Sequence, residues 1–117
     1  MMAVLSDDNR QVAMTVSWMP QPAGERVVKI HILQDHPEMP DHTSWELWVI
    51  PHGSDKPVSM GFVTLAREQV LKLKPEAAKV LETAAVIALS LEPEKGSPTG
   101  LPTGPVLFKG PCLTVST

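Results

Sequence analysis

The sequence predicts an all-β fold, an antiparallel β-sandwich of immunoglobulin-like or barrel-like form with about eight short strands and one short helix. Three observations support this prediction. Apolar and polar residues alternate over most of the first two thirds of the chain, as they do in half-buried strands. Turn-forming residues interrupt this alternation about every ten residues. The sequence does not show the regular succession of strands and helices that a parallel α/β sheet requires.

The first third of the chain is predicted to contain three strands. Apolar side chains at every second position of residues 12–18 fall on one face, with the period of two that defines a strand. The Ser-Asp-Asp-Asn sequence at 6–9 is typical of a turn. Residues 2–5 and 10–18 are therefore predicted to form a hairpin, and a third strand follows at 26–34.

The middle of the chain is predicted to contain three more strands and the helix. Residues 44–50 and 58–65 alternate in the same way and are separated by polar loops. Gly61 indicates a β-bulge or a close backbone approach, because glycine weakens a regular strand. A strand at 69–73 precedes a helix at 75–82, which begins with a proline, a residue suited to the first helical turn.

The last third is predicted to hold the centre of the sheet and its closing strands. Residues 84–91 are apolar on both faces, which predicts a central strand. The segment 96–104 is rich in glycine and proline, so it excludes a regular helix or a ladder strand. Two short strands, at 105–109 and 112–115, are predicted on either side of a Lys-Gly-Pro break.

The composition fits one compact domain spanning residues 1–117. A hydrophobic content of 43% is sufficient for a core in a chain of this length. The formal net charge is −3 and no run of like charges exceeds two residues, which argues against a nucleic-acid interface. No apolar stretch reaches the ~18 residues of a transmembrane helix, so this chain is not expected to span a membrane itself.

No motif indicates a metal site, a cofactor site or an enzyme active site. The four histidines, His31, His36, His42 and His52, match no compact zinc-ligand spacing. The single cysteine, Cys112, excludes an intrachain disulfide and is predicted to be a small buried residue. The sequence lacks the G-x-S-x-G motif of a nucleophile elbow and any phosphate-binding loop. We therefore predict no catalysis, no metal and no cofactor.

Two tryptophans on one predicted strand raise the question of an exposed patch. Trp45 and Trp48 should fall on opposite faces if the strand is regular. Core packing is expected for at least one of them. The other would lie either on a second covered face or at an exposed patch, where it could bind a partner or a ligand.

Two segments resemble a known family. The sequences WELWVIPHGSDKPVSMG, at 45–61, and AVIALSLEPEKGSPTGLPTGPVLFKG, at 85–110, are similar to the C-terminal extracytoplasmic domain of the anti-sigma-K factor family. The resemblance covers residues 44–110, and the G-S-P-T-G-x-P-T-G-P string is its most specific part. The sequence departs from the family pattern at Glu94-Lys95, where small residues are common, and at Trp45, where tyrosine is frequent.

The resemblance implies a regulator rather than a catalyst. Such a protein is a single-pass inner-membrane anti-sigma factor, and regulated proteolysis by a membrane protease releases its extracytoplasmic-function sigma factor. This chain would be its outer, periplasmic domain, excised from a longer protein whose cytoplasmic domain binds the sigma factor. The alternative is a free-standing β-sandwich module that binds a small ligand or a peptide.

The Gly/Pro segment is predicted to act as a rigid strap that packs over the sheet edge, since its prolines restrict the unfolded chain. A second hypothesis makes it a recognition surface for a partner. On that hypothesis the partner-binding residues are Trp48, Glu92, Ser97, Pro98, Thr99, Gly100, Pro102, Thr103 and Gly104.

Overall fold

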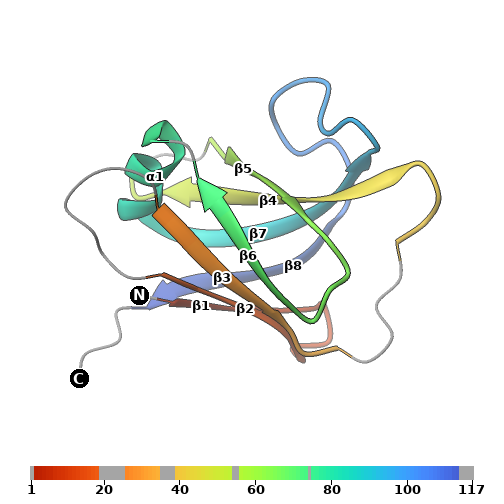
Figure 1. Cartoon of the computed structure of the whole chain (residues 1–117), viewed down its shortest axis with the longest axis horizontal. Coiled ribbons are helices and arrows are strands. Elements are labelled where there is room, and N and C mark those ends of the chain that lie inside the picture. The colour runs from red at the N-terminus through yellow and green to blue at the C-terminus, as the bar shows by residue number, and fades with distance from the viewer. Residues whose placement is uncertain (1, 19–25, 35–38, 54–55, 74, 114–117) are drawn as a thin grey trace.

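A computed structural model describes residues 2–18, 26–34, 39–53, 56–73 and 75–113 (Figure 1). It contains eight strands and one helix. In chain order these are β1 (Met2–Ser6), β2 (Val12–Trp18), β3 (Arg26–Ile32), β4 (Thr43–Pro51), β5 (Val58–Val63), β6 (Glu68–Leu73), α1 (Pro75–Glu82), β7 (Ala84–Pro93) and β8 (Val106–Leu113).

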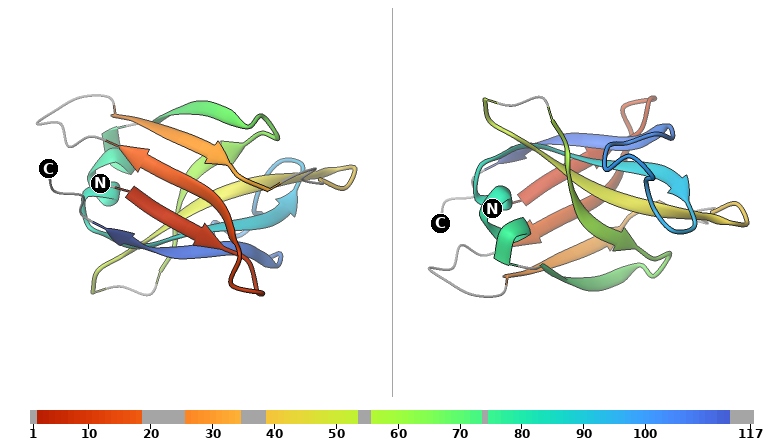
Figure 2. Two further views of the ribbon diagram at one scale, coloured as in Figure 1. Left: turned by 90° about the horizontal axis from the view of Figure 1, so that it is seen from below. Right: turned by 90° about the horizontal axis from the view of Figure 1, so that it is seen from above.

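The strands form one antiparallel sheet in the order β5-β4-β7-β8-β1-β2-β3-β6. This sheet curls until its first and last strands, β5 and β6, approach each other, as the views from below and from above in Figure 2 show. At this seam the Leu71 side chain of β6 lies 3.7 Å from where a Cβ on Gly61 of β5 would stand. The predicted all-β antiparallel fold is confirmed, in its barrel-like form.

The core fills the inside of this barrel. Along β4, Trp45, Leu47 and Val49 alternate inward and join the main buried cluster. The ring of Trp45 meets Phe108 of β8 edge-to-face, with ring centroids 6.0 Å apart and planes at 85°. Edge-to-face packing is a favoured arrangement of aromatic rings. The large side chains of β4 and β8 therefore pack across the neighbouring strand β7.

Several local predictions are confirmed. The helix occupies residues 75–82 and buries Ala78 and Leu81. The register between β4 and β5 shifts beside Gly61, whose φ is 115°, so the predicted bulge is present. β7 lies between β4 and β8 and buries most of its length, as a central strand should.

The prediction of two closing strands is wrong. β8 runs without interruption from Val106 to Leu113, while Thr114 and Val115 lie outside the described residues. Gly110 and Pro111 do not break the strand, because the two flanking strands, β7 and β1, continue to pair with β8 there. Pro111 lies opposite Val86 of β7, and Cys112 lies opposite Ala3 of β1.

Gly110 permits a very close approach between β8 and β1. A Cβ at this position would lie 1.8 Å from the carbonyl oxygen of Val4. We expect Gly110→Ala to lower the free energy of unfolding by about 3 kcal/mol or more, because backbone must shift to admit the methyl group. Chemical denaturation monitored by circular dichroism measures this loss. Lys109→Ala, at the exposed neighbouring position, should change the stability by no more than about 0.5 kcal/mol.

Candidate functional site: a strap over two buried carboxylates

Polar side chains are buried on the outer side of the barrel, where β4 and β7 lie together. Glu46 and Trp48 alternate with the core residues of β4, and Ser90 and Glu92 do so along β7. The register places Glu46 directly opposite Ser90. Their relative exposures are 5% for Glu46, 0% for Trp48, 0% for Ser90 and 1% for Glu92. A buried carboxylate is unfavourable unless it is hydrogen-bonded, so its partners define this site.

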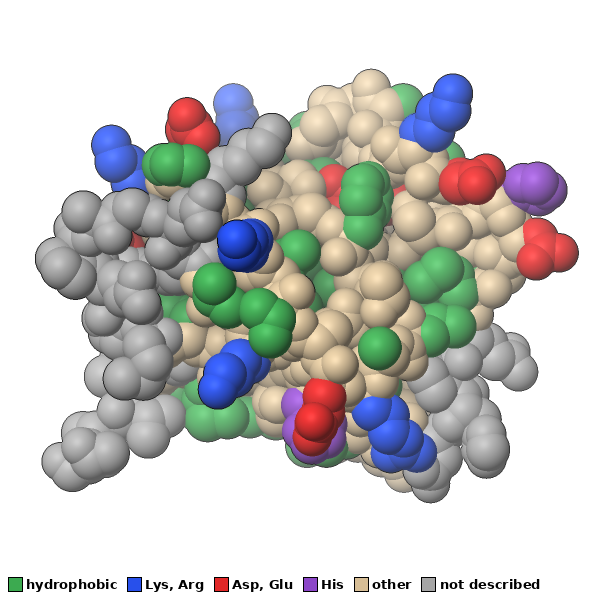
Figure 3. All heavy atoms as spheres, viewed as in Figure 1, with side chains coloured by type: hydrophobic (Ala, Val, Ile, Leu, Met, Phe, Trp, Pro, Cys, Tyr) green, Lys and Arg blue, Asp and Glu red, His purple; other side chains and the backbone are tan. Residues whose placement is uncertain are grey.

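The partners of both carboxylates come largely from the segment 96–104, which we call the strap. The strap leaves the end of β7, loops outward and returns to β8 (Figure 1). Seen from above, it lies over the ends of β7 and β4 (Figure 2). The strap contains no charged residue. In the space-filling view of Figure 3, the region of the strap at the upper right is mostly tan, and charged side chains lie beside it.

Glu92 holds the C-terminal end of the strap. The backbone N–H of Thr103 donates to both carboxylate oxygens, at 3.1 and 3.2 Å, and the Thr103 hydroxyl donates to Oε1 at 2.6 Å. The backbone N–H of Gly104 donates to Oε2 at 3.2 Å. From its own strand, the Ser90 hydroxyl donates to Oε2 at 2.5 Å. Four donor groups therefore converge on one carboxylate.

Glu46 holds the N-terminal end of the strap in the same way. The backbone N–H of Ser97 donates to Oε1 at 3.0 Å, and the hydroxyl of Ser59 on β5 donates to Oε2 at 2.5 Å. The two glutamates thus fix residues 97 and 103–104, on either side of the strap's tip. Because hydrogen bonds to a charged acceptor are about twice as strong as neutral ones, these are the strongest bonds between strap and barrel.

Trp48 completes the hydrogen-bond network on the side of the barrel. Its indole Nε1–H donates to Ser90 Oγ at 2.8 Å, and the same hydroxyl donates its own hydrogen to Glu92. A hydroxyl that accepts one bond is polarised to donate another more strongly. Trp48 therefore orients Ser90 toward the carboxylate. Trp45, on the opposite face, has no hydrogen-bond partner for its buried indole nitrogen among the described residues.

The tip of the strap is held by bonds within the strap itself. The Ser97 hydroxyl donates to the carbonyl oxygen of Leu101, and the backbone N–H of Thr99 donates back to the Ser97 hydroxyl at 3.3 Å. The Thr99 hydroxyl also donates to the Leu101 carbonyl, at 3.2 Å. Serine and threonine form such local turns readily. Because proline has no backbone N–H, the strap has fewer donors that need a partner. The strap is thus a folded loop rather than a frayed linker.

Gly104 is required where the strap returns to the sheet. A Cβ at this position would lie 1.6 Å from the carbonyl oxygen of Leu91. Next to it, the backbone N–H of Leu91 donates to the Pro105 carbonyl at 3.0 Å. The absence of a side chain on Gly104 therefore lets the strap backbone reach Glu92.

The hydrogen bonds determine the charge state of Glu92. Burial disfavours ionisation and acts to raise the pKa of Glu92, but the bonds from Ser90, Thr103 and Gly104 outweigh it, so the pKa lies below its ordinary value of 4.5. A carboxyl group with a lowered pKa stabilises the folded state above its ordinary pKa. That contribution is lost as the pH falls through the folded-state value.

The structure confirms the strap and corrects two details of the prediction. The strap lies over β4 and β7, which are interior strands of the sheet, rather than over a sheet edge. The exposed alternative for Trp48 is wrong, since this side chain is fully buried on a second covered face. Glu92 is buried as well. Partner binding stays a prediction for the whole set named from the sequence, which is Trp48, Glu92, Ser97, Pro98, Thr99, Gly100, Pro102, Thr103 and Gly104.

Sequence reasoning missed Glu46 and Ser59. An outward-facing glutamate in an alternating strand resembles an ordinary solvent-exposed residue, and nothing local distinguishes it. Only the pairing of β4 with β7 brings Glu46 beside Ser90 and beneath the strap. A useful signal was present in the strap: backbone N–H groups of a packed loop need acceptors, and a carboxylate near each end can supply them.

The sequence predicts no metal-binding or catalytic role for the histidines or for Cys112. Among the described residues, no group of three or more His, Cys, Asp or Glu side chains could hold a metal ion. His31, His42 and His52 are exposed, and His36 lies outside the described residues. Cys112 is half-buried, and its burial raises the pKa of the thiol. That shift disfavours the reactive thiolate.

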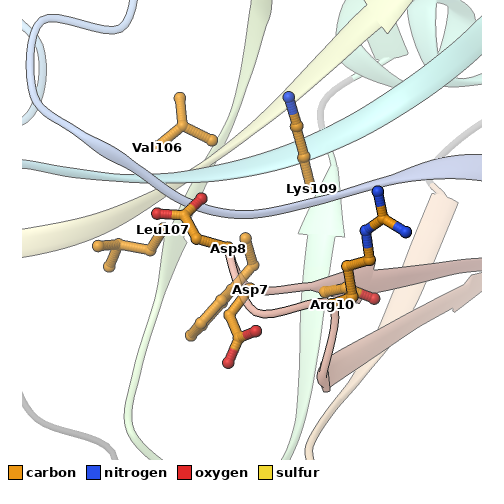
Figure 4. Close-up of a pocket in the computed structure, with 8 residues that line it drawn as sticks. Asp7, Asp8, Arg10, Val106, Leu107 and Lys109 are labelled. Carbon is orange, nitrogen blue, oxygen red and sulfur yellow. The ribbon is translucent and has the colours of Figure 1, made fainter.

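A hollow of about 300 Å³ lies where the turn between β1 and β2 meets β8 (Figure 4). Asp7, Asp8, Arg10 and Lys109 line it, so its two acidic and two basic side chains balance. Asp7 is already engaged, because its Oδ1 accepts the backbone N–H groups of Asn9 and Gln11. This balanced lining favours no class of ligand.

A family model described as the C-terminal part of the anti-sigma-K factor rskA matches residues 1–106. No curated protein and no solved structure matches the chain. The matched segment contains β1 to β7, both glutamates and the whole strap.

The network predicts that the charge of Glu92 stabilises the fold. We expect Glu92→Gln to lower the free energy of unfolding at pH 7 by about 2 kcal/mol, because a neutral amide accepts fewer hydrogen bonds and points N–H groups at donors. The matched control is Glu94→Gln. Its carboxylate is exposed and lies 3.5 Å from the exposed His42, so we expect a change within about 0.5 kcal/mol. Urea denaturation of both variants makes the comparison, and equal losses would contradict the assignment.

Proposed function

Because the chain belongs to the anti-sigma-K factor C-terminal family, we propose that it is the extracytoplasmic regulatory domain of a single-pass membrane anti-sigma factor. Family membership makes it an anti-sigma factor domain and gives the protein as a whole a sigma factor as its partner. The finer proposal is that residues 1–117 form one domain, on the periplasmic side of the inner membrane, and that a cytoplasmic domain binds the sigma factor.

In this proposal the domain controls access of a membrane protease. Proteases cleave segments that can leave the folded structure and extend into the active site, so a domain that fixes its long loops resists them. The observation that carries the proposal is the family match over residues 1–106, which includes the strap. The two buried glutamates then explain how a long Gly/Pro-rich loop is kept folded on the barrel. A signal that loosens the domain would permit cleavage and release the sigma factor.

The role is regulatory rather than catalytic. The family regulates a sigma factor. The polar cluster in this chain also has its donors and acceptors directed at one another, with Glu92 engaged by Ser90, Thr103 and Gly104. A catalytic carboxyl group needs access to a substrate. No helix in the described residues is long and apolar enough to cross a bilayer.

Fractionation of the native organism tests the proposal. An antibody raised against this chain should detect a protein well above 12.7 kDa in the membrane fraction. In spheroplasts, the same antibody added from outside should bind this domain, whereas an antibody against a cytoplasmic marker should not bind. A soluble band near 12.7 kDa would contradict the membrane proposal and favour the free-standing binding module instead.

A further inference from the structure

We propose that the strap is an acid-sensitive latch, in which protonation of Glu92 releases residues 96–104 while the barrel beneath stays folded. The regulatory role of the latch rests on the proposed extracytoplasmic function, because only an outer domain is exposed to the external pH. As a physical device it is a property of this chain alone and can be tested without the sigma factor or the protease.

The first step of the argument is that the strap is held by acceptors that need their negative charge. Glu92 receives N–H or O–H groups from Ser90, Thr103 and Gly104. Glu46 receives them from Ser97 and Ser59. A protonated carboxyl group carries its own O–H and must point it at one of these donors. Protonation therefore removes attraction and leaves a buried donor without an acceptor.

The second step is that the two carboxylates hold opposite ends of one segment. Glu46 fixes Ser97, and Glu92 fixes Thr103 and Gly104. Between these points the strap bonds to itself, through Ser97, Thr99 and Leu101. Nearby backbone bonds, from Gly96 to the Pro93 carbonyl and from Leu91 to the Pro105 carbonyl, lie at the bases of the loop. The strap can therefore move away from the barrel as one folded loop while the backbone bonds at its two ends remain.

The third step is that release leaves the core intact. Both glutamates lie on the outer side of the barrel, whereas the main buried cluster consists of apolar residues inside it. The largest apolar side chain of the strap, Leu101, is itself exposed, so it adds little to the apolar burial that holds the strap on the barrel. Local opening with a free energy below that of global unfolding is the expected result.

Other titratable groups around the latch are exposed. They are Glu94 and Lys95 before the strap, His42 before β4 and Lys109 on β8. His42 and Glu94 pair with each other at 3.5 Å, and their side-chain exposures are 89% and 72%. Exposed pairs contribute little to stability. The buried carboxylate of Glu92 is therefore the group through which pH acts on the strap.

The direction of the response follows from Glu92. Its hydrogen bonds keep the pKa of Glu92 below 4.5, so the latch is closed at and above that pH and opens as the pH falls through the folded-state value. The latch thus opens below pH 4.5 and stays closed at neutral pH.

A nuclear magnetic resonance titration of the 117-residue chain tests the latch directly. The backbone amide signals of Thr103 and Gly104, which donate to Glu92, should shift toward random-coil positions with a common midpoint below pH 4.5, and the Ser97 signal should shift as the strap leaves the barrel. At the same pH, signals of core residues such as Leu47 and Leu89 should stay dispersed. Loss of strap and core signals together, or a titration that leaves the strap signals dispersed, would overturn the proposal.

Glutamine variants provide a second test at neutral pH, since glutamine resembles the protonated carboxyl. Lys95 lies directly before the strap and provides a trypsin cleavage site. In the double variant Glu46→Gln/Glu92→Gln, cleavage after Lys95 should be about tenfold faster or more than in the wild type. Glu76→Gln, at an exposed position of α1, is the control and should cleave at the wild-type rate. Equal rates in the double variant and in this control, with a folded spectrum in each, would overturn the proposal.

Discussion

One buried carboxylate organises the outer face of this barrel. Glu92 lies at the end of the central strand, almost without solvent contact, and four donor groups from three residues meet its two oxygens. Burying an ion is unfavourable by itself, and only a full set of hydrogen bonds offsets that penalty. The strap supplies most of those bonds through its own backbone. Carboxylate and strap therefore depend on each other, since neither is stable there alone.

The pairing of β4 with β7 extends this arrangement to a second carboxylate. Since Glu46 stands opposite Ser90, two residues before Glu92 on β7, both acids lie on the same face of adjacent strands. Each carboxylate accepts hydrogen bonds from one end of the strap. The inward-facing positions of the same strands hold the apolar core. The two faces of β4 and β7 thus have separate functions, stability of the barrel on one side and retention of a loop on the other.

Much of the fold could be predicted from the sequence, because strands and the helix have local signatures. The period of two in 12–18 and 44–50 and the proline at the start of 75–82 placed β2, β4 and α1 closely. The closing strand could not be placed correctly, because Gly110-Pro111 resembles a break. Only two flanking strands, β7 and β1, keep the chain extended there.

The site could be predicted only in part. Glycine and proline spacing indicated a fixed strap, but not which residues fix it. Glu46 appears solvent-exposed in the sequence, and its role depends on a partner strand about 44 residues away in the chain. Trp48 and Glu92 were singled out as surface residues, whereas their chemistry lies in being buried together with Ser90. Strand register is a tertiary property, and it determined these roles.

Amide hydrogen exchange at neutral pH tests the central claim most directly, because it reports on the strap residue by residue. If Glu46 and Glu92 hold the strap, the amides of Ser97, Thr103 and Gly104 should exchange at least about tenfold more slowly than the amide of Gly100 at the exposed tip. In Glu92→Gln, protection of Thr103 and Gly104 should fall toward the level of Gly100. Equal, rapid exchange of all four amides in the wild-type chain would contradict the account.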